Sequence, residues 1–142
     1  MDQVTERIES LKAGLAGATA ATGVFCLVAG GMAWIEGLNS AFVPVTPTLA
    51  QTTLQAAIAL LSGFLFGVTY RYVIRSDRNS HLQSGAVLAF GLVRGLAPIR
   101  GLSDGPINWL IGLQLAESLL LFGMAALLIN GLMQMGWIKR FS

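Results

Sequence analysis

Three apolar stretches of this chain are each long enough to cross a lipid bilayer as a helix. They cover residues 13–35, 49–74 and 107–132. The hydrocarbon core of a bilayer is about 30 Å thick, and a helix needs about 20 residues to cross it. The first stretch carries no charged residue, and the third carries only Glu117. The chain is therefore predicted to be an integral membrane protein built from helices.

The composition supports this prediction. Charged residues make up 11% of the chain and hydrophobic residues 54%, whereas a typical soluble domain is about 25% charged. The basic residues lie at the ends of the apolar stretches instead of forming a patch, so no nucleic-acid partner is expected. Cys26 is the only cysteine, which excludes an internal disulfide and any metal site that needs several cysteines. We expect a single membrane domain over residues 1–142.

The first apolar stretch is expected to be a retained transmembrane helix. A signal peptide begins with basic residues, and its apolar region is about 7–15 residues long. Here Asp2, Glu6 and Glu9 outnumber the basic residues before the stretch, and the stretch itself is longer. Apolar residues recur at helical spacing from Val4 onward, which predicts that this helix begins near Val4.

A fourth apolar segment, residues 82–97, is shorter and contains Arg94. We expect a short third span, because the arginine can extend its head group to the interface. A segment of this length is also compatible with a re-entrant or interfacial segment. With four spans, the termini and the loop between the second and third spans share one side, which receives seven of the nine basic residues. The positive-inside rule then places both termini in the cytoplasm or stroma.

Local sequence signals mark the ends of the spans. Thr46 is expected to cap the second helix, with Pro47 as its first residue. Asp104 is a candidate cap for the last helix. Aromatic residues near the ends of spans, including Tyr70, are expected at the membrane interface. The predicted fold is an all-α membrane protein with four transmembrane helices.

Glycine pairs four residues apart occur in the second and third spans. They are Gly63 with Gly67 and Gly91 with Gly95. Small residues let helix backbones approach closely inside a membrane. The pairs predict either packing within the bundle or docking onto helices of another membrane protein, and both interpretations stay open.

Two charged residues are expected at membrane depth, Arg94 in the third span and Glu117 in the fourth. Such residues are costly in hydrocarbon and usually face a partner or a cavity. An ion pair between the two spans is one interpretation, although their distances from the span ends do not match well. An arginine that reaches the interface alone is another. The alternative function is a small oligomeric transporter or channel that uses both residues.

A basic cluster follows the second span and contains Arg71, Arg75 and Arg78. Its arginines either set the orientation in the membrane and contact anionic lipids, or form a docking surface for an acidic partner.

His81 is the only histidine and a candidate ligand for the metal of a pigment. The interpretation that we prefer is an interfacial or helix-starting polar residue at the beginning of the third span. Gln55 and Asn108 are further candidate pigment ligands. Chlorophyll, carotenoid or lipid is therefore a candidate cofactor. No HExxH, GxSxG or P-loop pattern occurs in the sequence, so no enzymatic activity is expected.

Three sequence features carry a resemblance. The second span ends in GVTYRYVIR, and the third opens with HLQSG and closes with AFGLVRGL. The region Gly63 to Ile99 thereby resembles a family of small uncharacterised membrane proteins of cyanobacteria and chloroplasts. The region covers about a quarter of the chain, and the first and last spans contribute nothing to the match.

The resemblance implies a thylakoid membrane and a role near photosynthetic complexes, and it transfers no binding residue. The expected function is a non-catalytic accessory subunit or assembly factor that docks onto a larger photosynthetic complex, such as a photosystem.

Overall fold

The computed structural model describes residues 3–38, 48–74, 80–97 and 109–139. These residues form four helices, namely α1 (Gln3–Leu38), α2 (Leu49–Val73), α3 (Ser80–Leu96) and α4 (Trp109–Gln134). The prediction of an all-α chain is confirmed for these residues. Helices α1, α2 and α4 are long and apolar enough to cross a membrane. Helix α3 has 17 residues, fewer than the about 20 that a crossing helix usually needs.

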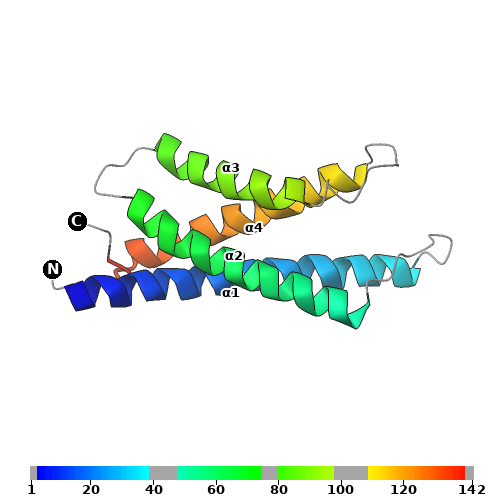
Figure 1. Ribbon diagram of the computed structural model, residues 1–142, viewed down its shortest axis with the longest axis horizontal. Helices are drawn as coiled ribbons and strands as arrows, with labels where there is room; N and C mark the ends of the chain where they lie inside the picture. Colours follow the sequence, from blue (N-terminus) through cyan, green and yellow to red (C-terminus); the bar gives the residue numbers. More distant parts are fainter. Residues whose placement is uncertain (1–2, 39–47, 75–79, 98–108, 140–142) are drawn as a thin grey trace.

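The helices run alternately up and down in an antiparallel bundle (Figure 1). Helix α1 lies along α2, α3 lies along α4, and α4 also contacts α1. The first residues of α1, the end of α2, the start of α3 and the last residues of α4 share one end, which we call the terminal end (Figure 1). The opposite end, where α2 and α4 begin, is called the far end.

Two helix starts can be compared with the sequence predictions. Helix α1 begins at Gln3, one residue before the predicted Val4. Helix α2 is capped by Thr48 instead of Thr46, because Thr48 and Gln51 form a capping box. The Thr48 hydroxyl accepts from the Gln51 amide at 3.3 Å, and the Thr48 amide donates to the Gln51 side-chain oxygen at 2.9 Å. The predicted positions Pro47 and Asp104 lie outside the described residues.

Helices α1 and α2 pack through their small residues. Gly17 of α1 faces Gly63 and Gly67 of α2, and Gly67 lies against the backbone of Ala13 and Gly14. A Cβ atom added to Gly67 would collide with the Ala13 carbonyl oxygen. The glycine pair of the second span therefore brings two backbones of the same chain together, as the packing interpretation predicted.

The glycine pair of the third span also packs within the chain. A Cβ on Gly95 would lie 2.9 Å from the Leu115 Cα of α4, and a Cβ on Gly91 would lie 2.6 Å from a methyl carbon of Leu119. These positions let α3 lie close to α4. All four glycines considered for partner docking are thus covered within the chain, which favours the packing interpretation.

Helix α1 buries small residues and exposes large apolar ones. Ala13 and Ala21 are fully buried, whereas Leu15 is 55% exposed and Leu27 is 77% exposed. A helix of a water-soluble protein usually does the opposite, because water drives its large apolar side chains inward. Helices in lipid associate through small residues and leave large apolar side chains to the lipid. The packing of α1 thus fits a lipid environment.

Aromatic rings fill the centre of the bundle. The ring of Phe66 on α2 lies 5.3 Å from that of Phe90 on α3 and 5.0 Å from that of Phe122 on α4. The rings of Phe66 and Tyr70 are stacked at 5.1 Å. Tyr70 is only 1% exposed, so its ring contacts other side chains of the bundle instead of the surroundings. Contact with this cluster keeps the ring inside.

Candidate functional site

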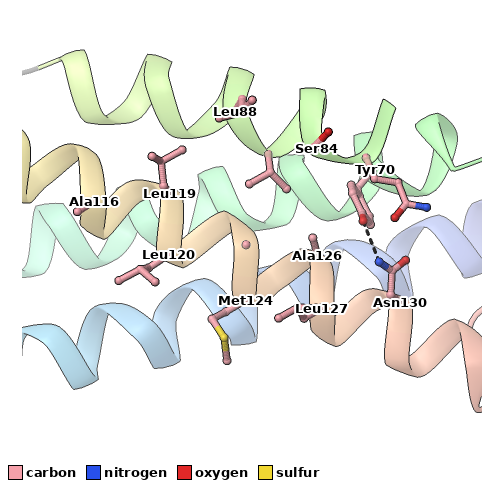
Figure 2. Close-up of a pocket in the computed structure, with 13 residues that line it drawn as sticks. Tyr70, Ser84, Leu88, Ala116, Leu119, Leu120, Met124, Ala126, Leu127 and Asn130 are labelled. Carbon is pink, nitrogen blue, oxygen red and sulfur yellow. Dashed lines mark hydrogen bonds between the residues drawn. The ribbon is translucent and has the colours of Figure 1, made fainter. Parts of the chain in front are cut away.

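An apolar groove lies between α3 and α4 and has a volume of about 940 Å³ (Figure 2). On the α4 side, Ala116 and Gly123 line it seven residues apart, with Leu120 between them. On the α3 side, Val87 and Leu88 line it. Residues that repeat every three or four positions share one face of a helix. The groove is therefore a continuous apolar face along α4, bordered by α3.

One end of the groove is polar. The Asn130 side-chain amide of α4 donates to the Tyr70 hydroxyl of α2 at 3.0 Å (Figure 2). Gln83 and Ser84 of α3 line the same groove. Because these residues lie near the ends of α2 and α4 and the start of α3, the polar end of the groove faces the terminal end of the bundle.

A second, smaller cavity of about 360 Å³ lies nearer the far end. Its polar lining comes from three helices. Gln55 and Ser62 belong to α2, Arg94 to α3 and Gln114 to α4. This cavity therefore places a cationic side chain beside neutral polar groups within the bundle.

The structure brings Arg94 and Glu117 together. Arg94 Nη1 donates to Ser118 Oγ at 3.2 Å and lies 3.9 Å from Glu117 Oε1. The Arg94 side chain is 12% exposed and that of Glu117 is 21% exposed. Counting residues from the expected span ends placed the two at different depths, whereas the structure brings their side chains within 3.9 Å of each other.

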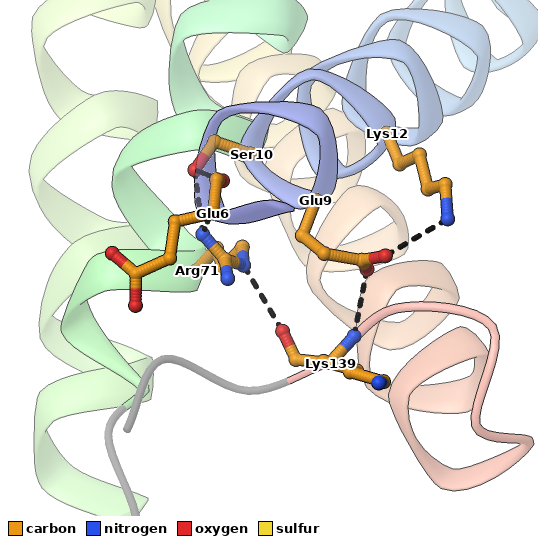
Figure 3. A network of polar contacts seen from close by, with 6 residues as sticks. All are labelled: Glu6, Glu9, Ser10, Lys12, Arg71 and Lys139. Atoms are coloured by element: carbon orange, nitrogen blue, oxygen red, sulfur yellow. Dashed lines mark hydrogen bonds and ion pairs between the residues drawn. The ribbon is translucent and has the colours of Figure 1, made fainter. Parts of the chain in front are cut away.

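Arg71 lies at the centre of a polar network at the terminal end (Figure 3). It is fully buried. Its Nη1 donates to Ser10 Oγ at 2.6 Å and to the Glu6 carbonyl at 3.1 Å, and its Nε donates to the Lys139 carbonyl at 3.0 Å. A buried guanidinium needs such acceptors because removing it from water is costly. Arg71 thus joins α1, α2 and the segment that follows α4.

Glu9 strengthens the same junction. Its Oε2 accepts from the Lys139 amide at 2.9 Å, and its Oε1 pairs with Lys12 Nζ at 2.8 Å (Figure 3). The chain after α4 is therefore tied to α1 through Glu9 and to α2 through Arg71. This network is a structural clamp, since its charges are occupied by groups of the chain itself.

The remaining predicted site residues are buried, exposed or outside the described residues. Arg71, one of the three arginines considered for docking, is buried and its guanidinium faces inward. Arg75 and Arg78 lie outside the described residues, as does Asn108. His81 is exposed on the first turn of α3.

Gln55 is exposed and lines the smaller cavity, away from the groove. Among the residues that the structure describes, no group of three or more His, Cys, Asp or Glu side chains comes together.

Sequence reasoning missed the groove and the polar partners of Arg71. The repeat of small residues along α4 is the only sequence pattern that could have indicated the groove. No sequence pattern around Ser10 indicates its hydrogen bond to Arg71. Comparisons with known proteins add no relative, since no protein-family model, curated protein or solved structure matches the chain.

Proposed function

We propose that the chain is a non-catalytic, membrane-embedded subunit that docks onto a larger membrane complex. All four helices would lie in the bilayer, with α3 as a short third span and both termini on the cytoplasmic or stromal side. The observation that carries the proposal is the apolar groove between α3 and α4, which opens sideways from the bundle. The occupant that we propose is an apolar transmembrane helix of the partner.

The lining of the groove supports a helix as the occupant. Ala116 and Gly123 are small and seven residues apart on α4, a spacing that keeps them on one seam between two packed helices. Helices in lipid associate where small residues permit close contact and where a polar side chain offers a hydrogen bond. Asn130 lies a further seven residues along the same face, so the seam ends in an amide.

The polar groups of the bundle favour a binding role over a catalytic one. Arg71, Glu9 and Lys12 are engaged in the clamp, and Arg94 and Glu117 lie beside each other. The assignment to a thylakoid and a photosynthetic complex rests on the resemblance of residues 63–99 alone. Fractionation of membranes from the source organism tests it, since enrichment outside the photosynthetic membrane would contradict it.

The test of docking uses two glycines of the same helix. A Cβ on Gly123 would meet no atom within 4 Å, and the same holds for Gly112, which does not line the groove. Gly123→Leu therefore places a bulky side chain in the groove at a position where its Cβ touches no neighbouring atom, and Gly112→Leu is its matched control. Tagged variants are extracted in mild detergent, and the proteins that accompany them are quantified by mass spectrometry.

We expect Gly123→Leu to reduce recovery of the partner about tenfold, which corresponds to about 1.4 kcal/mol of docking free energy, while Gly112→Leu leaves it unchanged. Equal recovery with both variants would refute the docking face. Co-purification of a chlorophyll, carotenoid or lipid in place of a protein, lost in Gly123→Leu, would also refute it and assign the groove to a small ligand.

A further inference from the structure

We propose that the cavity around Arg94 binds an oxyanion of the phosphate or sulfonate class. The oxyanion comes either from the head group of an anionic lipid or from a free inorganic anion. This site lies toward the far end of the bundle and uses α2, α3 and α4. It is separate from the groove, which Arg94 does not line.

The first argument is the donor capacity that Arg94 retains. A guanidinium carries five N–H donors in a planar fork. The described contacts of Arg94 use Nη1 alone, and its Nε is buried without a hydrogen-bond partner among the described residues. A buried donor of a charged group that makes no hydrogen bond is unfavourable. A small rotation of the side chain toward the cavity would let the fork engage an oxyanion through two parallel bonds.

The second argument is the weak neutralisation of the charge. Charge-assisted bonds from nitrogen to a carboxylate oxygen are usually about 2.7–2.9 Å long. The 3.9 Å between Arg94 Nη1 and Glu117 Oε1 is longer than that. The positive charge of Arg94 is therefore only partly compensated, although its side chain is mostly buried.

The third argument is the lining and depth of the cavity. Its other polar groups among the described residues are neutral, and the amides of Gln55 and Gln114 can donate to an oxyanion. Arg94 lies two residues before the end of α3, a rise of about 3 Å. With α3 as a short span, a lipid phosphate would reach the cavity from this end of α3. The cavity volume of about 360 Å³ is in the range of sites that hold small ligands.

The experiment measures binding to the full chain in nanodiscs. The nanodiscs contain phosphatidylcholine alone, phosphatidylcholine with phosphatidylglycerol, or phosphatidylcholine with inorganic phosphate in the buffer. Bound lipid is counted by native mass spectrometry, and thermal unfolding is followed by circular dichroism. The variants are Arg94→Gln, Arg94→Lys and Glu117→Gln. Arg7→Gln is the matched control, because Arg7 is an exposed arginine at the terminal end.

We expect phosphatidylglycerol to bind the natural chain and Arg94→Gln to bind it at least about tenfold more weakly, as for the loss of one charge-assisted contact. Arg94→Lys should bind with intermediate affinity because a lysine lacks the fork. Glu117→Gln should bind about 3–10-fold more tightly, because a like charge near the oxyanion is removed. Arg7→Gln should bind as the natural chain does.

Each outcome decides the proposal. If phosphatidylglycerol raises the unfolding temperature and inorganic phosphate does not, the site is assigned to a lipid. If both raise the unfolding temperature, the site is assigned to a free anion. Binding that is unchanged in Arg94→Gln, or weakened in Glu117→Gln, overturns the site. If Arg94→Gln does not fold, the sign of the Glu117→Gln effect still decides, because a purely structural ion pair predicts no gain in anion binding.

Discussion

Replacing Gly67 with alanine tests whether α1 and α2 are held at the distance that the small residues set. The added Cβ would collide with the Ala13 carbonyl oxygen and lie 3.0 Å from the Gly14 Cα. Both are backbone atoms of α1, so no side-chain rotation relieves the contact. Helix α1 must move away from α2 as a unit.

The expected loss of stability is about 1–3 kcal/mol, the usual range for an overpacked core. The separation of the two helices also weakens the contacts around Gly67, because a gap of about 0.5–1 Å removes about a quarter to a half of each contact energy of about 0.1–0.2 kcal/mol. The better helix propensity of alanine, worth up to about 1 kcal/mol in water, offsets only part of this.

The assay is unfolding in mixed micelles, in which a denaturing detergent is titrated and helix content is followed by circular dichroism. Gly131→Ala is the matched control, because a Cβ there would meet no atom within 4 Å. We expect Gly131→Ala to be at least as stable as the natural chain and Gly67→Ala to unfold at a lower fraction of denaturing detergent. Equal midpoints for the two variants would refute the packing argument.

Two further predictions concern buried charges. Arg71→Met should lower the free energy of unfolding by about 2–4 kcal/mol, because three acceptors lose their donor. Hydrogen exchange at Lys139 should then quicken, and unchanged exchange would contradict the clamp. Arg94→Leu and Glu117→Leu should couple by about 0.5–1 kcal/mol in a double-mutant cycle of unfolding, a modest value because 3.9 Å separates the charged atoms. Additive effects would show that the two residues do not interact.

The helices were predictable because hydropathy and helical spacing report the environment of a whole segment. All three long stretches correspond to helices, and the start of α1 differs from the prediction by one residue. The bond partners of individual polar residues were not predictable in this way. Arg71 lies near the end of α2, where a sequence pattern alone suggests contact with water or lipid head groups.

In the structure, protein atoms solvate Arg71 instead. The first turns of α1 extend beyond its apolar stretch and supply the Glu6 carbonyl and the Ser10 hydroxyl. The glycine pairs show the same limit. Gly63 and Gly67 indicate that a helix packs closely against α2, but the sequence does not say whose helix it is. That information lies in the complementary small residues of α1, such as Gly17, which only the assembled bundle identifies.

The unequal lengths of α1 and α3 have a consequence for the surrounding bilayer. At 36 and 17 residues, they measure about 54 Å and about 26 Å. In lipid, α3 would be shorter than the hydrocarbon core of the bilayer is thick. This hydrophobic mismatch would compress the lipid chains next to α3. A neighbouring protein that covers α3 relieves the compression. The membrane itself would therefore favour assembly on the α3 side, in addition to any direct contact between the two proteins.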